Sequence, residues 1–311
     1  MTTSPSLKLK FNQQQNNEQQ PLPTILPQLM ISLARNAMRE EIYLTPKPGL
    51  VDANNNGSHN DMTLDTFILS INAISPYIGQ FLLASWNAPN CPASELLSLL
   101  RPIGINAEKA MFKATNGVNT HKGMIFILGL ISGAVGWLRA RNMHVDANGI
   151  SEVIQTACQH LVEEELTQQS NEVSNSATAG EKTYQKYGLS GARGEAESGL
   201  SSIIHYALPA YKKSLKNGAT TQQAMHHTLL TLLANNNDSN LVSRGGLEGL
   251  SFVKARASEL LKQKEDRFFC FEKSLVDFDN QLMAKNLSPG GSADLLAATW
   301  LINEIEQLFN S

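Results

Sequence analysis

The chain has 311 residues, of which 42% are apolar and 17% charged, the composition of a globular protein and not of a disordered one. Its net charge of −3 gives no sequence-wide basic field for nucleic acid or anionic lipid, so any contact with phosphates must come from a local site. The three cysteines lie far apart in the sequence. This excludes a disulfide framework or a Cys-rich zinc site and favours a reduced, cytoplasmic protein.

Residues 1–24 form a polar stretch in which eight of the ten residues from 11 to 20 are Gln or Asn. Such a stretch buries too little apolar surface to offset its ordering entropy, so we expect a disordered tail that carries no chemistry. It has no basic start followed by an apolar run and therefore predicts no secretory signal. A folded domain is expected over residues 25–311.

From Ile25 onward, apolar residues recur at spacings of three and four, which is the period of an amphipathic helix. Strict alternation of apolar and polar residues is hard to find, and Ala and Leu are frequent at the apolar positions. The fold is therefore predicted to be all-α, a multihelical single domain. A polar stretch over residues 167–183 is expected to form a flexible surface loop. The helical pattern is clearest just after residue 25 and over residues 64–83, 107–114, 150–166, 222–233, 250–261 and 293–308.

The most apolar segment runs from Met124 to Leu138 and is closed by Arg139. It is shorter than the roughly 20 residues that a membrane-spanning helix needs, so we expect a buried helix and no membrane span. Gly129 and Gly133 give this segment a GxxxG spacing, which in a globular protein predicts close contact with another helix.

Five short segments between helices, or at their starts, combine glycine with charged or amide residues. Glycine lets a backbone approach a ligand closely, and helix N-termini present free N–H groups to phosphate. In a helical fold such loops can gather at one end of the bundle, so we expect them to form a single polar active site. The segments are residues 45–61, 117–123, 191–197, 237–246 and 286–294.

The usual nucleotide and hydrolase motifs, GxxxxGK[ST], GxGxxG, HExxH and GxSxG, are absent. The five segments offer carboxylates and amides that suit Mg²⁺, together with Lys and Arg side chains that suit a polyphosphate. The composition of the segments therefore points to a metal–polyphosphate ligand. These side chains are the carboxylates Asp52, Asp61, Glu195, Asp238 and Asp294, the imidazoles His59 and His121, and the cations Lys47, Lys122, Arg193 and Arg244.

Structural interpretations of the same residues stay open. His59 and His121 are also compatible with hydrogen-bonded structural histidines, and Asp294 with a carboxylate that offsets a helix dipole. Arg193 and Glu195 are close enough in sequence for a local ion pair. The remaining histidines and the run Glu163 to Glu165 lie in ordinary helical segments and are interpreted as structural or solvated.

In their order along the chain, the segments resemble the triphosphoribosyl-dephospho-CoA synthase family over about residues 35–308. The resemblance is carried by Thr-Pro-Lys-Pro-Gly-Leu-Val-Asp (45–52), Leu-Arg-Pro-Ile-Gly (100–104), Gly-Val-Asn-Thr-His-Lys-Gly (117–123), Gly-Ala-Arg-Gly-Glu-Ala-Glu (191–197) and Asn-Leu-Ser-Pro-Gly-Gly-Ser-Ala-Asp-Leu-Leu (286–296). The resemblance implies an all-helical transferase that acts on ATP and 3′-dephospho-CoA. The expected products are 2′-(5″-triphosphoribosyl)-3′-dephospho-CoA and adenine.

The family's product is the precursor of the prosthetic group on the acyl carrier protein subunit of citrate lyase or malonate decarboxylase, to which a separate transferase attaches it. Which of these two enzymes is served stays open. Three departures from the family pattern are visible. Ala53 and Asn60 stand where family members commonly carry basic residues, and Ser239 replaces a threonine but keeps the hydroxyl.

The reaction requires a base for the attacking 2′-hydroxyl, for which Asp61 or His59 is the first candidate and Asp238 the alternative. Two other functions stay open: an Mg²⁺-dependent all-α nucleotide hydrolase that needs no CoA-derived acceptor, and a regulator that binds ATP without turnover. We expect substrate contacts from Lys47, Asn119, His121, Lys122, Arg193, Glu195, Asn240, Arg244 and Ser292, and Mg²⁺ ligands from Asp52, Asp238 and Asp294.

Overall fold

The computed structural model describes residues 25–167, 179–263 and 271–310. The tail predicted over residues 1–24 and most of the loop predicted over residues 167–183 lie outside the described residues. Across the described part every regular element is a helix, which confirms the all-α prediction. The α-helices are α1 (Leu26–Tyr43), α2 (Leu64–Trp86), α3 (Leu96–Ala114), α4 (Lys122–Ala140), α5 (Ala147–Ala157), α6 (Ala179–Tyr187), α7 (Gly191–Glu197), α8 (Leu208–Lys216), α9 (Thr221–Asn235), α10 (Ser239–Gln263), α11 (Phe271–Ala284) and α12 (Gly290–Asn310). Shorter helical turns are η1 (Ala93–Glu95), η2 (Glu163–Thr167) and η4 (Ile203–Ala207), of which the last two are π-helical.

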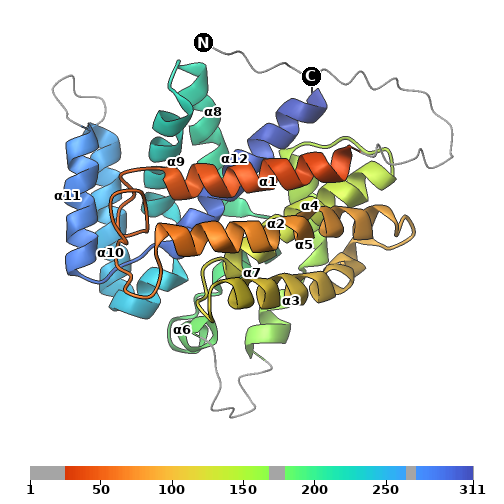
Figure 1. Cartoon of the computed structure of the whole chain (residues 1–311), viewed down its shortest axis with the longest axis horizontal. Helices are drawn as coiled ribbons and strands as arrows, with labels where there is room; N and C mark the ends of the chain where they lie inside the picture. The colour runs from red at the N-terminus through yellow and green to blue at the C-terminus, as the bar shows by residue number, and fades with distance from the viewer. Residues whose placement is uncertain (1–24, 168–178, 264–270, 311) are drawn as a thin grey trace.

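The helices pack around one continuous core, with α2 against α1, α3 and α4, and α12 against α1, α4 and α9 (Figure 1). The long α10 pairs with α11 at one side of the molecule (Figure 1). Four of the five glycine-containing segments lie in the loops that precede α2 and α4 or across the starts of α10 and α12. Hydrogen bonds from Ser58 to Leu287 and from Ser292 to Asp238 bring the α1–α2 loop and the starts of α10 and α12 to the same part of the bundle.

The GxxxG spacing marks a close helix contact, as predicted. A Cβ added at Gly129 would lie only 2.8 Å from the ring of Phe81 on α2, and one at Gly133 would overlap Leu100 on α3. Both α2 and α4 are long and apolar enough to cross a membrane by length and composition. Most of α4 is buried inside the bundle, however, and α2 is covered by α1, α3 and α4. Core packing therefore accounts for the apolar character of α4 and for part of that of α2.

Several boundaries differ from the sequence prediction. Helices α3 and α10 each begin eleven residues before the stretches predicted over residues 107–114 and 250–261. The helix predicted over residues 150–166 breaks after Ala157, because His160 adopts a left-handed conformation with φ of 68°. The apolar pattern nevertheless continues across the break, since Leu161 and Leu166 are both buried. The loop predicted over residues 167–183 is shorter than expected, because α6 already begins at Ala179. Helix α11 was not predicted, although Leu275, Phe278 and Leu282 form its buried stripe.

Candidate active site

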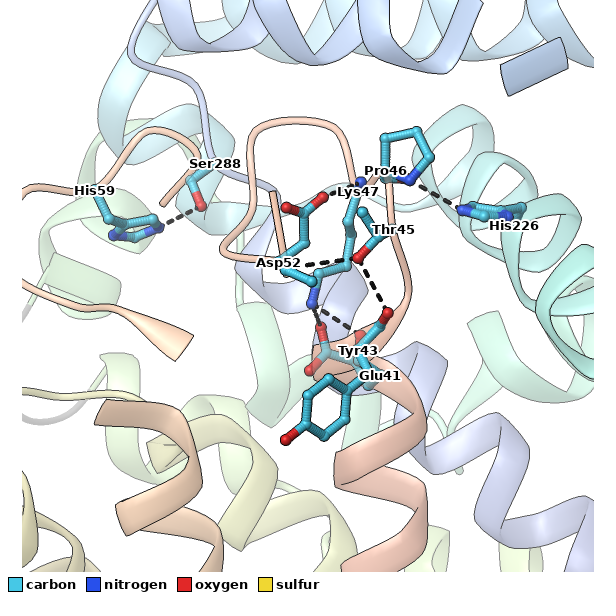
Figure 2. Close-up of polar contacts among 10 residues, drawn as sticks. Glu41, Tyr43, Thr45, Pro46, Lys47, Asp52, His59, His226 and Ser288 are labelled. Atoms are coloured by element: carbon cyan, nitrogen blue, oxygen red, sulfur yellow. Dashed lines mark hydrogen bonds and ion pairs between the residues drawn. The ribbon is translucent and has the colours of Figure 1, made fainter. Parts of the chain in front are cut away.

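The loop between α1 and α2 lies directly against the turn that leads into α12. Ser58 Oγ donates a hydrogen bond to the carbonyl of Leu287 at 2.7 Å, and His59 Nε2 lies 2.8 Å from Ser288 Oγ (Figure 2). Gly49 has a φ of 72° and approaches Leu287 so closely that a Cβ would overlap its carbonyl oxygen. The first and last glycine-containing segments therefore form one surface, although more than 220 residues separate them.

Asp52 shapes the α1–α2 loop from within. Its Oδ2 accepts a hydrogen bond from the backbone N–H of Lys47 at 2.8 Å. Its Oδ1 accepts hydrogen bonds from the N–H groups of Asn54 and Asn55 at 2.7 and 3.1 Å. The side chain is buried and is surrounded by the turn that it stabilises. Ligation of Mg²⁺ by Asp52 stays a prediction, and it would have to share oxygens that the backbone already occupies.

A buried ion pair lies beneath this loop. Lys47 is only 1% exposed, and its Nζ donates to the carbonyl oxygen of Glu41 at 2.9 Å and to the Glu41 carboxylate (Figure 2). Burial raises the pKa of Glu41, and the positive charge of Lys47 opposes that rise. Lys47, predicted to hold phosphate, thus faces a carboxylate of its own chain in this structure.

Asp238 joins the start of α10 to the start of α12. Its Oδ2 accepts hydrogen bonds from both the backbone N–H and the hydroxyl of Ser292, at 2.7 and 2.9 Å. Its Oδ1 accepts one from the N–H of Asn240 at 2.9 Å. Burial raises the pKa of Asp238, and these hydrogen bonds oppose the rise. Gly290 packs against the side-chain amide of Asn240, so the fourth and fifth segments are also in direct contact.

Unsatisfied polar groups gather at the N-terminus of α4. His121 is 1% exposed, its Nδ1 hydrogen-bonds with Ser70 Oγ at 2.7 Å, and its Nε2 has no partner among the described residues. Burial and the nearby charge of Lys47 lower the pKa of His121 to about 3, so the ring is neutral. Asp294 is only partly exposed and lies against Gly123. The burial of its carboxylate, together with the charges of Glu41 and Asp238, raises the pKa of Asp294 well above the usual range.

His59, Asp61 and Arg244 form the outer edge of the site. Arg244 donates hydrogen bonds to the Ser58 carbonyl at 2.7 Å and to the Asn286 side chain at 2.9 Å. A further Arg244 nitrogen donates to His59 Nδ1 at 3.2 Å, while Asp61 Oδ1 lies 3.7 Å from the same atom. Burial and the charge of Arg244 lower the pKa of His59. Arg244 and Asp61 stay exposed, so both are accessible to a ligand.

The third segment does not form the local ion pair considered from the sequence. Arg193 Nε donates to Glu165 at 2.6 Å, and Arg101 of α3 pairs with the other oxygen of the same carboxylate. Glu195 instead accepts hydrogen bonds from the N–H and hydroxyl of Ser202, both at 2.8 Å. The interpretation of Arg193 and Glu195 as a mutual pair is therefore wrong, because each side chain reaches a different element.

Lys122 and Asn119 lie at the entrance to α4. Lys122 Nζ lies 3.1 Å from Glu108 of α3 and is about half exposed. The Asn119 side chain accepts a hydrogen bond from the Lys122 N–H at 3.2 Å and so satisfies one free donor of the helix start. Substrate contacts by these two residues, as by the other site residues, stay predictions.

Two buried acidic residues of the site were not identified from the sequence. Glu41 lies in the buried stripe of α1 between Met38 and Ile42, and Asp279 lies in that of α11 beside Phe278. Asp279 accepts hydrogen bonds from Gly49 N–H at 2.8 Å and from the Asn55 side chain at 2.9 Å. The sequence does carry a signal for both residues, because each places a carboxylate at an apolar position of the helical repeat. A buried charge requires a partner, so such a position indicates a buried polar contact.

Comparison with known proteins identifies the family. A sequence model of ATP:dephospho-CoA triphosphoribosyl transferases matches residues 27–311. The chain belongs to the ATP:dephospho-CoA triphosphoribosyl transferase family. A relative from Vibrio cholerae serotype O1, named a probable 2-(5''-triphosphoribosyl)-3'-dephosphocoenzyme-A synthase, is 58% identical over 91% of this chain and 90% of its own.

Two further relatives carry the same description. The one from Photobacterium profundum, also named as probable, is 48% identical over 92% of this chain and 91% of its own. The one from Pectobacterium atrosepticum is 48% identical over 86% of both chains. No solved structure matches the chain significantly. The resemblance drawn from the glycine-containing segments is thus confirmed at the level of family and enzyme class.

Proposed function

We propose that this protein transfers the 5-triphosphoribosyl group of ATP to the 2′-hydroxyl of 3′-dephospho-CoA and releases adenine. The family match over residues 27–311 carries the proposal. The geometry supports it, because the segments at residues 45–61, 237–246 and 286–294 contact one another and offer both carboxylates and cations. A site for two anionic substrates needs both kinds of group.

The reaction is a glycosyl transfer, so the triphosphate stays intact. The bond between the anomeric carbon and adenine breaks, and its electron pair moves to adenine. The 2′-oxygen of the acceptor forms the new bond to the anomeric carbon. The transition state carries positive charge on the ribose ring, as in glycoside hydrolysis. The 2′-hydroxyl proton must pass to a group of the protein or to solvent, and departing adenine must gain one.

Among the three candidate bases, Asp61 is the one that the geometry favours. It is 65% exposed, and its Oδ1 lies 3.7 Å from His59 Nδ1. His59 Nδ1 already accepts a hydrogen bond from Arg244, which leaves Nε2 as the protonated nitrogen of the neutral ring. Asp238 is buried, and both of its oxygens accept hydrogen bonds from backbone groups. We therefore assign proton acceptance to Asp61 and orientation of the α1–α2 loop to His59.

We propose that Mg²⁺ enters with the triphosphate and is held mainly by Asp294. No group of three potential metal ligands converges among the described residues, so a preformed all-protein cage is not expected. Mg²⁺ usually binds one or two carboxylates together with substrate phosphates. Asp294 fits this role because no described side chain or backbone group is hydrogen-bonded to it, and Glu41 and Asp238 add negative charge around it. When bound, the ion would neutralise charge on the phosphates.

The remaining substrate contacts follow from exposure. Arg244 and Lys122 are accessible and are assigned to phosphates, whereas buried Lys47 acts as the counter-ion of Glu41 next to the site.

The product is a precursor of an acyl carrier protein's prosthetic group, which a separate transferase attaches. We also infer that the protein works in the cytoplasm, where ATP and 3′-dephospho-CoA are available.

The test is mass-resolved chromatography of the full-length protein with ATP, Mg²⁺ and 3′-dephospho-CoA. Adenine should appear in equal amount with a triphosphoribosyl adduct of dephospho-CoA. Adenine or ADP formed equally fast without the acceptor would show a hydrolase instead. ATP binding without any conversion would show a regulator. Repeating the assay with chelator in place of Mg²⁺ tests the metal, because activity that survives chelation would contradict the ion's role.

A further inference from the structure

Two arginines and one glutamate form a bridge between helices at the side of the site. Arg101 lies on α3, Arg193 on α7 and Glu165 on the π-helical turn η2. Arg193 Nε donates to one oxygen of Glu165 at 2.6 Å, and an Arg101 Nη atom donates to the other. Burial alone would raise the pKa of Glu165, but the hydrogen bonds and positive charges of the two arginines together lower it. The carboxylate is therefore charged, and the three side chains carry a net charge of about +1.

Within the described part of the chain, most hydrogen-bond donors of the bridge have no protein partner. A guanidinium has five N–H donors, and each of these arginines uses one on Glu165, with no other hydrogen bond to the described residues. Arg101 is 51% exposed and Arg193 is 30% exposed, so the free donors reach solvent. Two guanidinium groups fixed on one carboxylate are preorganised for a second anion with several oxygens.

Two connections place the bridge beside the active site. Gly191, the first residue of α7, packs against Ser239 at the start of α10, next to Asp238. On α3, Glu108 lies two turns after Arg101 on the same face, at a distance of about 10 Å. Glu108 pairs with Lys122, which begins α4 beside Gly123. The bridge is thus within reach of a substrate extending from the site.

The two regions offer different groups to a phosphate. Near Asp294 the carboxylates of Glu41 and Asp238 outnumber the single cation Lys47, which suits a triphosphate that brings its own Mg²⁺. The Arg101–Glu165–Arg193 bridge is positive and suits phosphates that carry no metal. The acceptor has such a group, because 3′-dephospho-CoA carries a diphosphate on the same ribose as the attacking 2′-hydroxyl.

We propose that the Arg101–Glu165–Arg193 bridge binds the diphosphate of the acceptor 3′-dephospho-CoA. This assignment rests on the proposed transferase function, and it adds Arg101 and Glu165 to the residues considered for the site. Arg101 and Arg193 donate to the diphosphate oxygens. Glu165 is a positioning residue that holds the two guanidinium groups side by side.

The test measures the Kd of 3′-dephospho-CoA by calorimetry on the full-length protein, with and without an unreactive ATP analogue and Mg²⁺. R101M and R193M should each raise this Kd on the order of 10- to 100-fold, since each loses charge-assisted hydrogen bonds. The Kd of the ATP analogue should stay within about twofold of the wild-type value, because the bridge does not touch the donor. R256M is the matched control, since Arg256 pairs with Glu259 on α10 at 2.6 Å outside the site.

E165Q separates binding from a purely structural role. Its amide keeps one oxygen for one arginine but places an NH2 group, which cannot accept, against the other guanidinium. The Kd of 3′-dephospho-CoA should therefore rise, by less than in R101M or R193M because both arginines remain. A structural bridge would instead lower the thermal midpoint of all three variants and leave the Kd unchanged, which would overturn the proposal. A rise confined to the Kd of the ATP analogue would overturn it as well. The wild type could bind 3′-dephospho-CoA and still form no adduct, and this result would contradict the proposed function. The Kd values of the variants would then still decide whether the bridge binds 3′-dephospho-CoA.

Discussion

Replacing Gly123 with alanine tests whether the position of Asp294 matters for the reaction. A Cβ at residue 123 would lie 3.2 Å from Asp294 Cγ and closer still to its Oδ2. Carbon atoms normally approach to about 3.5–4.0 Å, so the carboxylate has to move on the order of 1 Å. A displacement of that size in a reacting group costs on the order of 100-fold in rate. We therefore expect kcat/KM of G123A to fall about 100-fold.

The stability of the same variant should change little. Gly123 is the second residue of α4, and alanine is favoured over glycine in helices by up to about 1 kcal/mol. This gain offsets part of the repulsion, so the free energy of unfolding in urea should change by no more than about 1 kcal/mol. G180A is the matched control, because a Cβ at that position of α6 meets nothing within 4 Å. Its activity and stability should both stay close to those of the wild type.

The double variant G123A/D294A shows whether the effect passes through Asp294. If it does, alanine at position 123 costs no further activity once the carboxylate is gone, because the two changes act on one interaction. Fully additive losses would instead indicate a disturbed α4. If G123A keeps the kcat/KM of the wild type, the role assigned to Asp294 is refuted. Its carboxylate would then tolerate displacement, and the reaction would not depend on its position or on a metal ion bound to it.

Three further predictions concern single residues. Asp61→Asn should lower kcat about 100- to 10,000-fold by removing the base, with ATP binding by calorimetry unchanged and D65N as a control. Asp279→Ala should lower the free energy of unfolding in urea by roughly 1–4 kcal/mol, because the buried Gly49 N–H and the partly buried Asn55 amide lose their acceptor. D277A on the exposed face should change it by less than about 0.5 kcal/mol. The pKa of His121 is about 3 when folded and 6.5 in the reference state, so the unfolded chain binds an extra proton as pH falls from 6.5 towards 3 and stability is lost over that window. H121Q should flatten this part of the pH dependence, and an unchanged slope would show that His121 does not titrate in this way.

The sequence was sufficient for features that depend on local pattern. Helical periodicity predicted the all-α fold, and the spacing of Gly129 and Gly133 predicted the close packing of α4, because both follow from which residues share a helix face. The break at His160 was not predictable in this way. Buried Leu161 and Leu166 preserve the apolar period, while the left-handed conformation of one residue redirects the backbone.

Contacts between distant segments could not be predicted from the same patterns. Arg193 and Glu195 are neighbours in sequence, yet Arg193 pairs with Glu165, 28 residues earlier. Asp279 contacts Gly49 across 230 residues, which no spacing rule connects. Such partners are set by how α7 and α11 pack against the bundle, and this depends on the whole tertiary structure. The sequence predicted which residue types would gather but not which side chains would meet.

The carboxylates of the site fall into two groups by their hydrogen bonds. Asp52, Asp238 and Asp279 each accept bonds from backbone N–H groups of the loops or of the helix starts that follow them. Removing any of them leaves buried donors without an acceptor, so these residues are needed to build the loops whether or not they touch substrate. Asp61 and Asp294 accept no such bonds in the described structure. A carboxylate in a glycine-containing motif can therefore serve to stabilise a loop and not to take part in the reaction. A proton or a metal ion has access to the carboxylate oxygens that are free of such bonds, which are those of Asp61 and Asp294.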